Sequence, residues 1–316
     1  MPLVDMPLAE LETHKPSLTR RDDFGAFWDA TLKAALAQPL NADLRPHDHA
    51  ATGVRVARAE WDGFAAGRIS GWYLEPEGPG PYPAMVLFHG YSGRAPSVVA
   101  SLLWASQGFV VLGVDCRGQV GESTDGVVYP GGHRPGFMTQ GIESNETYYY
   151  RYVFADCARA IELVASQDAV DAERIGVMGG SQGGALSLAT AALVPDRVKF
   201  CAASVPFLCH FRRAVDLAEY PYREIADYVR AHPDRCDRAF ETLSYFDNMN
   251  LADRIRARVL VSCGLWDAIC PPSTVFAAYN RMQCEKEMLA YPFHGHEEGD
   301  DWHERVFAMM KRGLQA

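Results

Sequence analysis

The sequence lacks long hydrophobic runs, an excess of basic charge and a recognisable signal peptide. Its longest apolar runs, Ala84–Phe88 and Phe109–Val114, fall far short of the ~18 residues that cross a bilayer. Thirty Lys and Arg residues against 40 Asp and Glu give a net charge of −10, whereas a nucleic-acid-binding protein would carry a basic surface. The start of the chain, Met1–Asp5, has neither a basic segment nor an apolar core. We therefore expect no membrane helix, no nucleic-acid partner and no export.

Paired cysteines are also missing, because the eight cysteines are scattered and no Cys-x-x-Cys motif occurs. Several of them, such as Cys263, lie in apolar segments, which favours buried thiols over disulfides. The pattern predicts a reduced, cytoplasmic protein. With 48% hydrophobic and 22% charged residues, the chain of 316 residues has the composition of a globular protein with a full core.

Short apolar runs alternate with helical patterns along most of the chain. The runs predict strands at Val54–Trp61, Ile69–Leu74, Ala84–Phe88, Phe109–Asp115, Ile175–Met178, Phe200–Val205, Val259–Cys263 and Met288–Tyr291. The period of the apolar residues predicts helices at Asp23–Ala37, Thr147–Gln167, Gln182–Leu193, Ser273–Met282 and His303–Lys311. This alternation is typical of an α/β domain with a mostly parallel sheet flanked by helices, which we expect to cover residues 1–316 as a single domain.

Three segments depart from the alternation. Residues 1–50 form a predicted N-terminal helical extension, and residues 120–142 are rich in Gly and Pro and predict a long loop. Residues 206–250 combine Arg, Tyr and Asp in a helical pattern and predict a helical insertion over the sheet edge. Long excursions of this kind often serve as lids or interface elements.

The chemistry centres on a Gly-x-Ser-x-Gly motif, Gly179–Gly183, directly after an apolar strand and before a helix. A nucleophile on such a tight turn needs neighbours without side chains, because the backbone there is strained and crowded. The turn also directs the first N–H groups of the helix at the substrate. We therefore interpret Ser181 as a catalytic nucleophile, with a purely structural glycine turn as the alternative.

A serine hydroxyl needs a base and an orienting acid, and in the α/β-hydrolase fold these follow in the order Ser, Asp, His. Asp267 comes after the strand Val259–Cys263, and both His294 and His296 come after the last strand. Spacing alone leaves the choice between the two histidines open. A zinc site is a further alternative, because Asp300, Asp301 and His303 follow closely, although the spacing departs from that of metallo-hydrolases.

The oxyanion of an acyl transfer needs two N–H donors. One is expected from Gln182 after the nucleophile, and the other from Tyr91, in the loop after an early strand. The alternative for Tyr91 is an ordinary packed surface aromatic. His89, just before it, is expected to shape this loop and not to take part in catalysis.

Taken together, these residues resemble carbohydrate esterase family 7, the cephalosporin C deacetylases and acetyl xylan esterases. The resemblance covers essentially the whole chain and depends on three motifs, Arg117-Gly118-Gln119, Gly179–Gly183 and His296-Glu297. Of these, Arg117-Gly118-Gln119 is the most discriminating, since most serine hydrolases lack it after this strand.

The resemblance implies an α/β-hydrolase fold and assigns the open positions. It implies Ser181 as nucleophile, His296 as base, Asp267 as acid, and oxyanion donors from Tyr91 and Gln182. It further implies a cytoplasmic homo-hexamer, without cofactor or metal, that removes acetyl and other short acyl groups from sugars, acetylated xylo-oligosaccharides and cephalosporin C.

The preferred acyl group and alcohol are less determined. Pro221 resembles the position that narrows the family's acyl pocket, with a helix-boundary proline as the alternative. The stretch Ser92–Ser97 and the pair His294-Gly295 depart from the family pattern, which affects the expected width of the pocket. The other function classes are a peptidase or longer-chain carboxylesterase, and a binding protein without activity. The latter is disfavoured because every triad position is filled.

Overall fold

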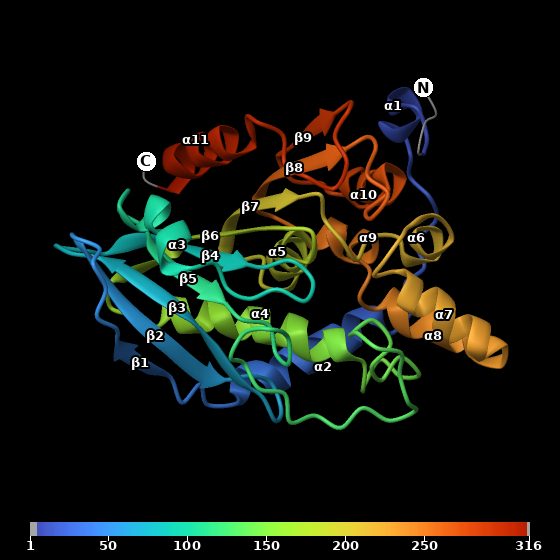
Figure 1. The fold of residues 1–316 in the computed structure, drawn as a ribbon, viewed down its shortest axis with the longest axis horizontal. Coiled ribbons are helices and arrows are strands. Elements are labelled where there is room, and N and C mark those ends of the chain that lie inside the picture. The colour runs from blue at the N-terminus through green and yellow to red at the C-terminus, as the bar shows by residue number, and fades with distance from the viewer. Residues whose placement is uncertain (1–4, 315–316) are drawn as a thin grey trace.

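Nine strands form one sheet in the computed structural model, which describes residues 5–314 (Figure 1). Their order across the sheet is β1-β2-β3-β5-β4-β6-β7-β8-β9. The strands are β1 (Asp43–Pro46), β2 (Val54–Asp62), β3 (Arg68–Pro76), β4 (Tyr82–Phe88), β5 (Val110–Val114), β6 (Val170–Gly180), β7 (Val198–Ser204), β8 (Arg258–Gly264) and β9 (Lys286–Tyr291). The pairs from β1 through β3 to β5 are antiparallel, and all pairs from β5 to β9 are parallel. The predicted α/β architecture with a mostly parallel sheet is confirmed.

Helices cover both faces of the sheet (Figure 1). One face carries α2 (Phe24–Ala37), α4 (Tyr149–Ala165), α5 (Gln182–Leu193) and α10 (Pro272–Tyr279), and the other carries α3 (Val98–Ala105) and α11 (Trp302–Leu314). Side chains of β4 alternate between the two cores, since Val86 and Phe88 join the first and Met85 and Leu87 the second. A strand buried on both faces needs apolar residues throughout, which explains the unbroken hydrophobic runs of the sequence.

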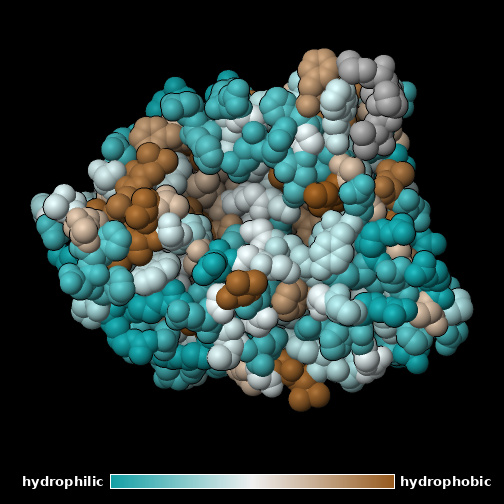
Figure 2. Space-filling model, viewed as in Figure 1, coloured by the Kyte–Doolittle hydropathy of each residue, from teal (hydrophilic) through white to brown (hydrophobic). Residues whose placement is uncertain are grey.

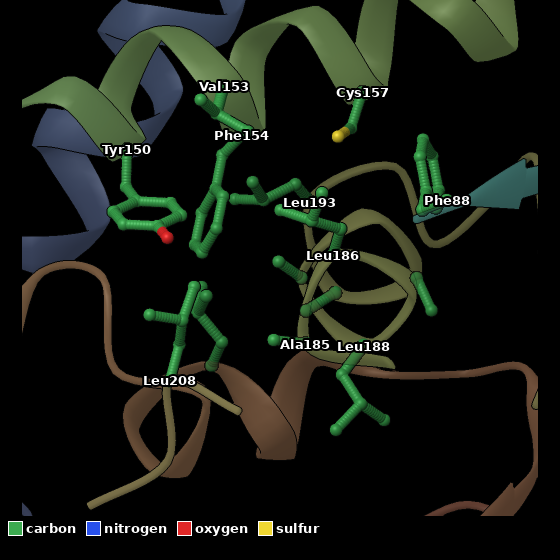
Figure 3. Close-up of a cluster of buried hydrophobic side chains, with 14 of the residues drawn as sticks. Phe88, Tyr150, Val153, Phe154, Cys157, Ala185, Leu186, Leu188, Leu193 and Leu208 are labelled. Carbon is green, nitrogen blue, oxygen red and sulfur yellow. The ribbon is translucent and has the colours of Figure 1, made fainter. Parts of the chain in front are cut away.

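Part of the first core lies between α4 and α5 (Figure 3). Tyr150, Phe154 and Cys157 of α4 point towards α5, which presents Leu186 and Leu193. All five side chains are almost fully buried. Because α5 begins directly after the serine of the Gly-x-Ser-x-Gly motif, this packing fixes the position of the turn.

Most predicted elements are present, and α5 has the predicted bounds. Two elements were not predicted. Strand β1 lies within the N-terminal extension that we expected to be helical, and its single apolar residue, Leu44, gives no alternating pattern at this sheet edge. Helix α3 is short and follows Ser97, whose Oγ accepts a hydrogen bond from the N–H of Ala100 at 3.2 Å. The first four residues of the predicted extension lie outside the described residues.

The insertion at 206–250 is helical, as predicted. It contains α6 (Phe211–Leu217), α7 (Arg223–Ala231), the 3₁₀ turn Pro233–Arg235, α8 (Cys236–Ser244) and α9 (Asn248–Leu251). Residues 120–142 contain neither helix nor strand, which confirms the predicted loop. At the N-terminus, the short helix α1 (Leu8–Leu11) packs against α10, and the Asn280 side chain donates to the carbonyl of Leu11 at 2.8 Å. Within residues 5–314 no helix combines the length and the apolar character that crossing a bilayer requires.

Candidate active site

Ser181 lies at the sharp turn between β6 and α5, with φ of 56° and ψ of −119°. A positive φ is unfavourable for a residue with a side chain and occurs where the surrounding structure enforces it. The glycines leave the necessary space, because a Cβ on Gly179 would lie 2.4 Å from the carbonyl oxygen of Phe88, and one on Gly183 only 2.1 Å from it. The turn therefore has the geometry of a nucleophile elbow.

Asp267 and His296 meet at the ends of β8 and β9. The Nδ1 of His296 lies 2.8 Å from Oδ2 of the buried Asp267. The other carboxylate oxygen, Oδ1, accepts the N–H groups of Ile269 and Cys270, both at 2.8 Å. With the carboxylate fixed in this way, Nδ1–H of His296 is the donor and Nε2 is the nitrogen that can take a proton from a hydroxyl.

His294 takes a different position from His296. Of the two histidines, only His296 contacts Asp267 within residues 5–314. The ring of His294 lies 5.2 Å from that of Tyr291, and its carbonyl accepts the N–H of Trp266 at 2.9 Å. The geometry thus favours His296 as the base and leaves His294 to connect the two loops.

The loops that carry His296 and Tyr91 both reach the elbow at Ser181. A Cβ built on Gly180, next to Ser181, would lie 3.4 Å from Oε1 of Glu298, two residues after His296. A Cβ built on Gly90 would lie 4.0 Å from the Cβ of Ser181. The serine, the histidine loop and the Gly90 loop therefore surround one space.

The backbone N–H groups of Tyr91 and Gln182 have no acceptor among residues 5–314, as expected of oxyanion donors. His89 shapes the loop as predicted, since its Nδ1 lies 2.7 Å from the carbonyl of Gly90 and its Nε2 accepts the N–H of Cys116 at 2.9 Å. Burial lowers the pKa of His89, which keeps the ring neutral in this tautomer.

The side chain of Tyr91 is fixed by hydrogen bonds and by packing. The alternative interpretation of Tyr91, as a packed aromatic residue, therefore describes its side chain. Its hydroxyl donates to Glu224 Oε1 at 2.8 Å and accepts the N–H of Phe137 at 2.5 Å. Glu224 also accepts the N–H of Met138 at 3.0 Å, and burial raises the pKa of this carboxyl. Glu224 was not predicted from the sequence, because an acid in an amphipathic helix carries no local signal of a partner 133 residues away.

Gln119 of the Arg117-Gly118-Gln119 motif contacts both the loop after Tyr91 and Gln182. Its side-chain amide pairs reciprocally with that of Gln182, at 3.0 and 3.2 Å, and its Oε1 accepts the N–H of Ser92 at 2.9 Å. The Oε1 of Gln182 also accepts the hydroxyl of Tyr150 at 3.0 Å. Gln119 therefore links the loop after Tyr91 to the start of α5.

Arg117 points elsewhere, into a fully buried ion pair with Asp156 of α4. Its Nε and Nη2 donate to the two oxygens of Asp156 at 2.6 and 2.8 Å, and Nη2 also donates to the carbonyl of Phe64 at 2.7 Å. Burial disfavours the charge, yet the Asp156 carboxylate holds the pKa of Arg117 above its usual value. Gly118, with φ of 63°, allows the chain to turn between Arg117 and Gln119. Asp156 was not predicted from the sequence, although a carboxylate on the buried side of a mostly apolar helix was an available signal.

The two remaining predicted site residues differ in their surroundings. Pro221 is buried just before α7, and the two residues before it contact the loop of Asp267 and the ring of Tyr91. The N–H of Glu219 donates to the carbonyl of Ala268 at 2.9 Å, and the ring of Tyr220 lies 6.1 Å from that of Tyr91. Glu297 is exposed, and its carboxylate has no hydrogen bond or ion pair within the described part of the chain.

The residues considered for a zinc site do not gather around His296. Within residues 5–314, the one group of three His, Cys, Asp or Glu side chains whose ligand atoms gather within 4.8 Å is Asp267, Cys270 and His296. His303 instead pairs with Glu298 at 2.9 Å, and Asp301 accepts the hydroxyl of Tyr291. The proposed ligands after His296 are thus engaged with other partners.

A mostly parallel sheet with a serine at a strand–helix turn and an Asp–His pair at later strand ends defines an α/β-hydrolase. The sequence profile of the acetyl xylan esterase (AXE1) family matches residues 1–312. The chain belongs to this family, carbohydrate esterase family 7, whose members are carboxylic ester hydrolases, and the resemblance found from the motifs is confirmed.

Individual relatives agree with this assignment. Acetyl esterase Axe7A of Xylanibacter ruminicola is 30% identical over 298 residues, which are 90% of this chain, and the chain spans 65% of that relative's length. The acetyl xylan esterase of Paenibacillus sp. R4 superposes with a TM-score of 0.95 at 41% identity, covering 98% of this chain and 100% of the other. Acetyl xylan esterase 1 of Thermoanaerobacterium sp. JW/SL YS485 superposes with a TM-score of 0.94 at 35% identity, covering 98% of this chain and 99% of the other.

Proposed function

We propose that this protein is a serine esterase that removes acetyl and other short acyl groups from acetylated sugars, including acetylated xylo-oligosaccharides, and from cephalosporin C. The observation that carries the proposal is the Asp267–His296 hydrogen bond of 2.8 Å beside a nucleophile elbow at Ser181. The names of the acetyl xylan esterases at 35 to 41% identity support sugar acetates as substrates. Cephalosporin C is proposed from the family resemblance.

The proposed mechanism follows from this geometry. Ser181 Oγ attacks the ester carbonyl while His296 Nε2 takes its proton, and the Asp267 carboxylate stabilises the resulting imidazolium. The N–H groups of Tyr91 and Gln182 bind the oxyanion of the tetrahedral intermediate. Collapse of the intermediate breaks the C–O bond to the sugar, whose oxygen takes the proton from the His296 imidazolium and leaves as a hydroxyl group. Ser181 remains acetylated. Water, activated by the same imidazole, then releases acetate and restores Ser181.

The acyl group is proposed to lie against Pro221. The support is that Pro221 is buried and that the two residues before it reach the site, Glu219 through a hydrogen bond to Ala268 and Tyr220 through its ring beside Tyr91. Proline fixes its own φ and cannot move aside, so it would form a rigid wall for the acyl chain.

The remaining expectations are part of the same proposal. We propose one α/β-hydrolase domain for the whole chain, supported by the single sheet that joins β1 to β9. A cytoplasmic location is supported by eight cysteines without a disulfide. Assembly into a homo-hexamer is proposed from the family resemblance alone.

Substitution of the nucleophile tests the proposal directly. Ser181→Ala should lower kcat for an acetyl ester by about 10⁴-fold or more, since triad residues act as a unit. It should also abolish covalent labelling by a serine-directed fluorophosphonate, which is read by intact-protein mass spectrometry. Labelling that persists at another residue would exclude Ser181, and faster turnover of peptides or octanoyl esters than of acetyl esters would exclude the short-acyl assignment.

A further inference from the structure

Almost all aromatic side chains of this protein are buried or half-buried. The chain contains six Trp, 14 Tyr and 15 Phe residues, all of which lie in the part that the structure describes. Three of them are exposed, Tyr220 at 55%, Trp266 at 38% and Phe293 at 63%. Large exposed aromatic rings are costly in water, and a group of them marks a binding surface. We call these three residues the aromatic rim.

The aromatic rim belongs to the loops that carry the catalytic groups. Trp266 immediately precedes Asp267, and Phe293 lies three positions before His296. The rings of Trp266 and Phe293 contact each other at 5.5 Å and 79°, and the Trp266 N–H joins the two loops through the carbonyl of His294.

The third ring stands over the oxyanion loop. The ring of Tyr220 lies 6.1 Å from that of Tyr91, and the neighbouring Glu219 bonds through its N–H to Ala268 in the loop of Asp267. The three exposed aromatic rings therefore lie on segments that contact the catalytic loops.

Carboxylates accompany the rings. Glu219 and Glu297 are exposed beside Tyr220 and His296, and the carboxylate of Glu297 has no partner among residues 5–314. A pyranose ring presents C–H groups on its faces and hydroxyls at its edge. Aromatic rings bind the faces, and carboxylate oxygens accept the hydroxyls. A fatty acyl chain, by contrast, would need an aliphatic groove without carboxylates.

We propose that the aromatic rim binds the pyranose ring of the leaving alcohol by stacking, so that it selects acetylated sugars over simple acetate esters. This inference rests on the proposed esterase function and names the residues that recognise its alcohol. The acyl group enters towards Ser181, so the alcohol of the ester extends towards solvent past these loops. Trp266 and Phe293 are placed to contact a sugar ring there, whereas the ethyl group of ethyl acetate is too short to cover two aromatic rings.

The test compares kcat/KM for acetylated xylobiose and for ethyl acetate, in the unmodified protein and in the double variant Trp266→Ala/Phe293→Ala. Loss of two stacking rings should lower the ratio of the two values about tenfold, mainly through KM for the sugar ester. The double variant Trp266→Phe/Phe293→Tyr keeps both rings and should restore the ratio to within about threefold.

A matched control removes exposed apolar side chains from α3, which carries none of the proposed catalytic groups. This helix lies at the left of Figure 1, where Figure 2 shows a hydrophobic area. Its Val99 and Leu103 are exposed at 68% and 49%. Val99→Ala/Leu103→Ala should leave the substrate ratio unchanged.

Several results would overturn the inference. An unchanged ratio in Trp266→Ala/Phe293→Ala, or an equal loss on both esters, would show that the rim does not bind the sugar. A change in assembly of this variant on size-exclusion chromatography would identify the rim as a contact between copies. If the unmodified protein hydrolyses ethyl acetate but no acetylated sugar, the proposed substrate itself fails, which is distinct from failure of the rim alone.

Discussion

Removing the carboxylate of Asp156 should destabilise the protein strongly, because it leaves the guanidinium of Arg117 buried without its main partner. The side chain of Arg117 is fully buried, and its bidentate contact with Asp156 spans 2.6 and 2.8 Å. Asp156 also accepts the N–H of Phe64 at 2.6 Å, so one substitution breaks three hydrogen bonds. A buried charge that loses its partner costs far more than the pair contributed.

The magnitude follows from what remains around Arg117. Breaking a buried ion pair costs about 3–5 kcal/mol, and the partly buried N–H of Phe64, left without its acceptor, adds up to about 1 kcal/mol. Asp125 stays 3.5 Å from Nη1 of Arg117 and offsets part of this loss. We therefore expect Asp156→Ala to lower the free energy of unfolding by about 4 kcal/mol, a large share of the ~5–15 kcal/mol of a typical protein.

Urea denaturation followed by circular dichroism measures this loss through the shift of the midpoint. The control is Asp227→Ala, which removes an exposed pair with Arg230 at 2.9 Å and should cost less than about 0.5 kcal/mol. The double variant Arg117→Met/Asp156→Leu removes both charges and should lose less than half as much as Asp156→Ala. If Asp156→Ala lost less than about 1 kcal/mol, or the double variant lost more than the single one, the argument from a stranded charge would be refuted.

Three further predictions concern the pair His294 and His296, the residue Pro221, and His210. His296→Ala should lower kcat on p-nitrophenyl acetate about 10³-fold or more, whereas His294→Ala keeps most activity, and the reverse order would show that His294 is the base. Pro221→Ala should raise turnover of octanoyl relative to acetyl esters, so an unchanged chain-length profile would remove Pro221 from the acyl pocket. Burial lowers the pKa of His210 to about 4, so the folded protein holds this ring neutral while the unfolded chain protonates it below pH 6.5. The free energy of unfolding should therefore fall by up to about 3 kcal/mol as the pH is lowered from 6.5 to 4. His210→Asn, which suits the φ of 45°, should flatten this pH dependence of the urea midpoint.

The architecture could be predicted because its signals are local. A strand covered on both faces is apolar at nearly every position, so β4 appears as a hydrophobic run. The elbow at Ser181 needs glycines at fixed distances along the chain, which a motif records. Strand β1 could not be predicted, because an exposed edge strand needs neither alternating apolar residues nor glycine, and its sequence therefore carries no pattern.

The contacts that hold the candidate site could not be predicted, because they join residues far apart in sequence. Tyr91 and Glu224 are 133 positions apart, and nothing in the neighbourhood of either residue marks the other. The sequence could not distinguish His294 from His296 for the same reason. Both lie in one loop two residues apart, and only the path of that loop after β9 brings His296, and not His294, to Asp267.

The Arg117-Gly118-Gln119 motif shows how a short sequence signal can combine separate tasks. Arg117 points into the core and binds Asp156 of α4, while Gln119 points to the active site and pairs with Gln182. The positive φ of Gly118 permits the change of direction between them. The ion pair thus fixes the backbone from which Gln119 reaches both Ser92 and the start of α5. Because the two N–H groups proposed to bind the oxyanion lie on these segments, the motif sets their spacing although none of its residues touches the nucleophile in our mechanism.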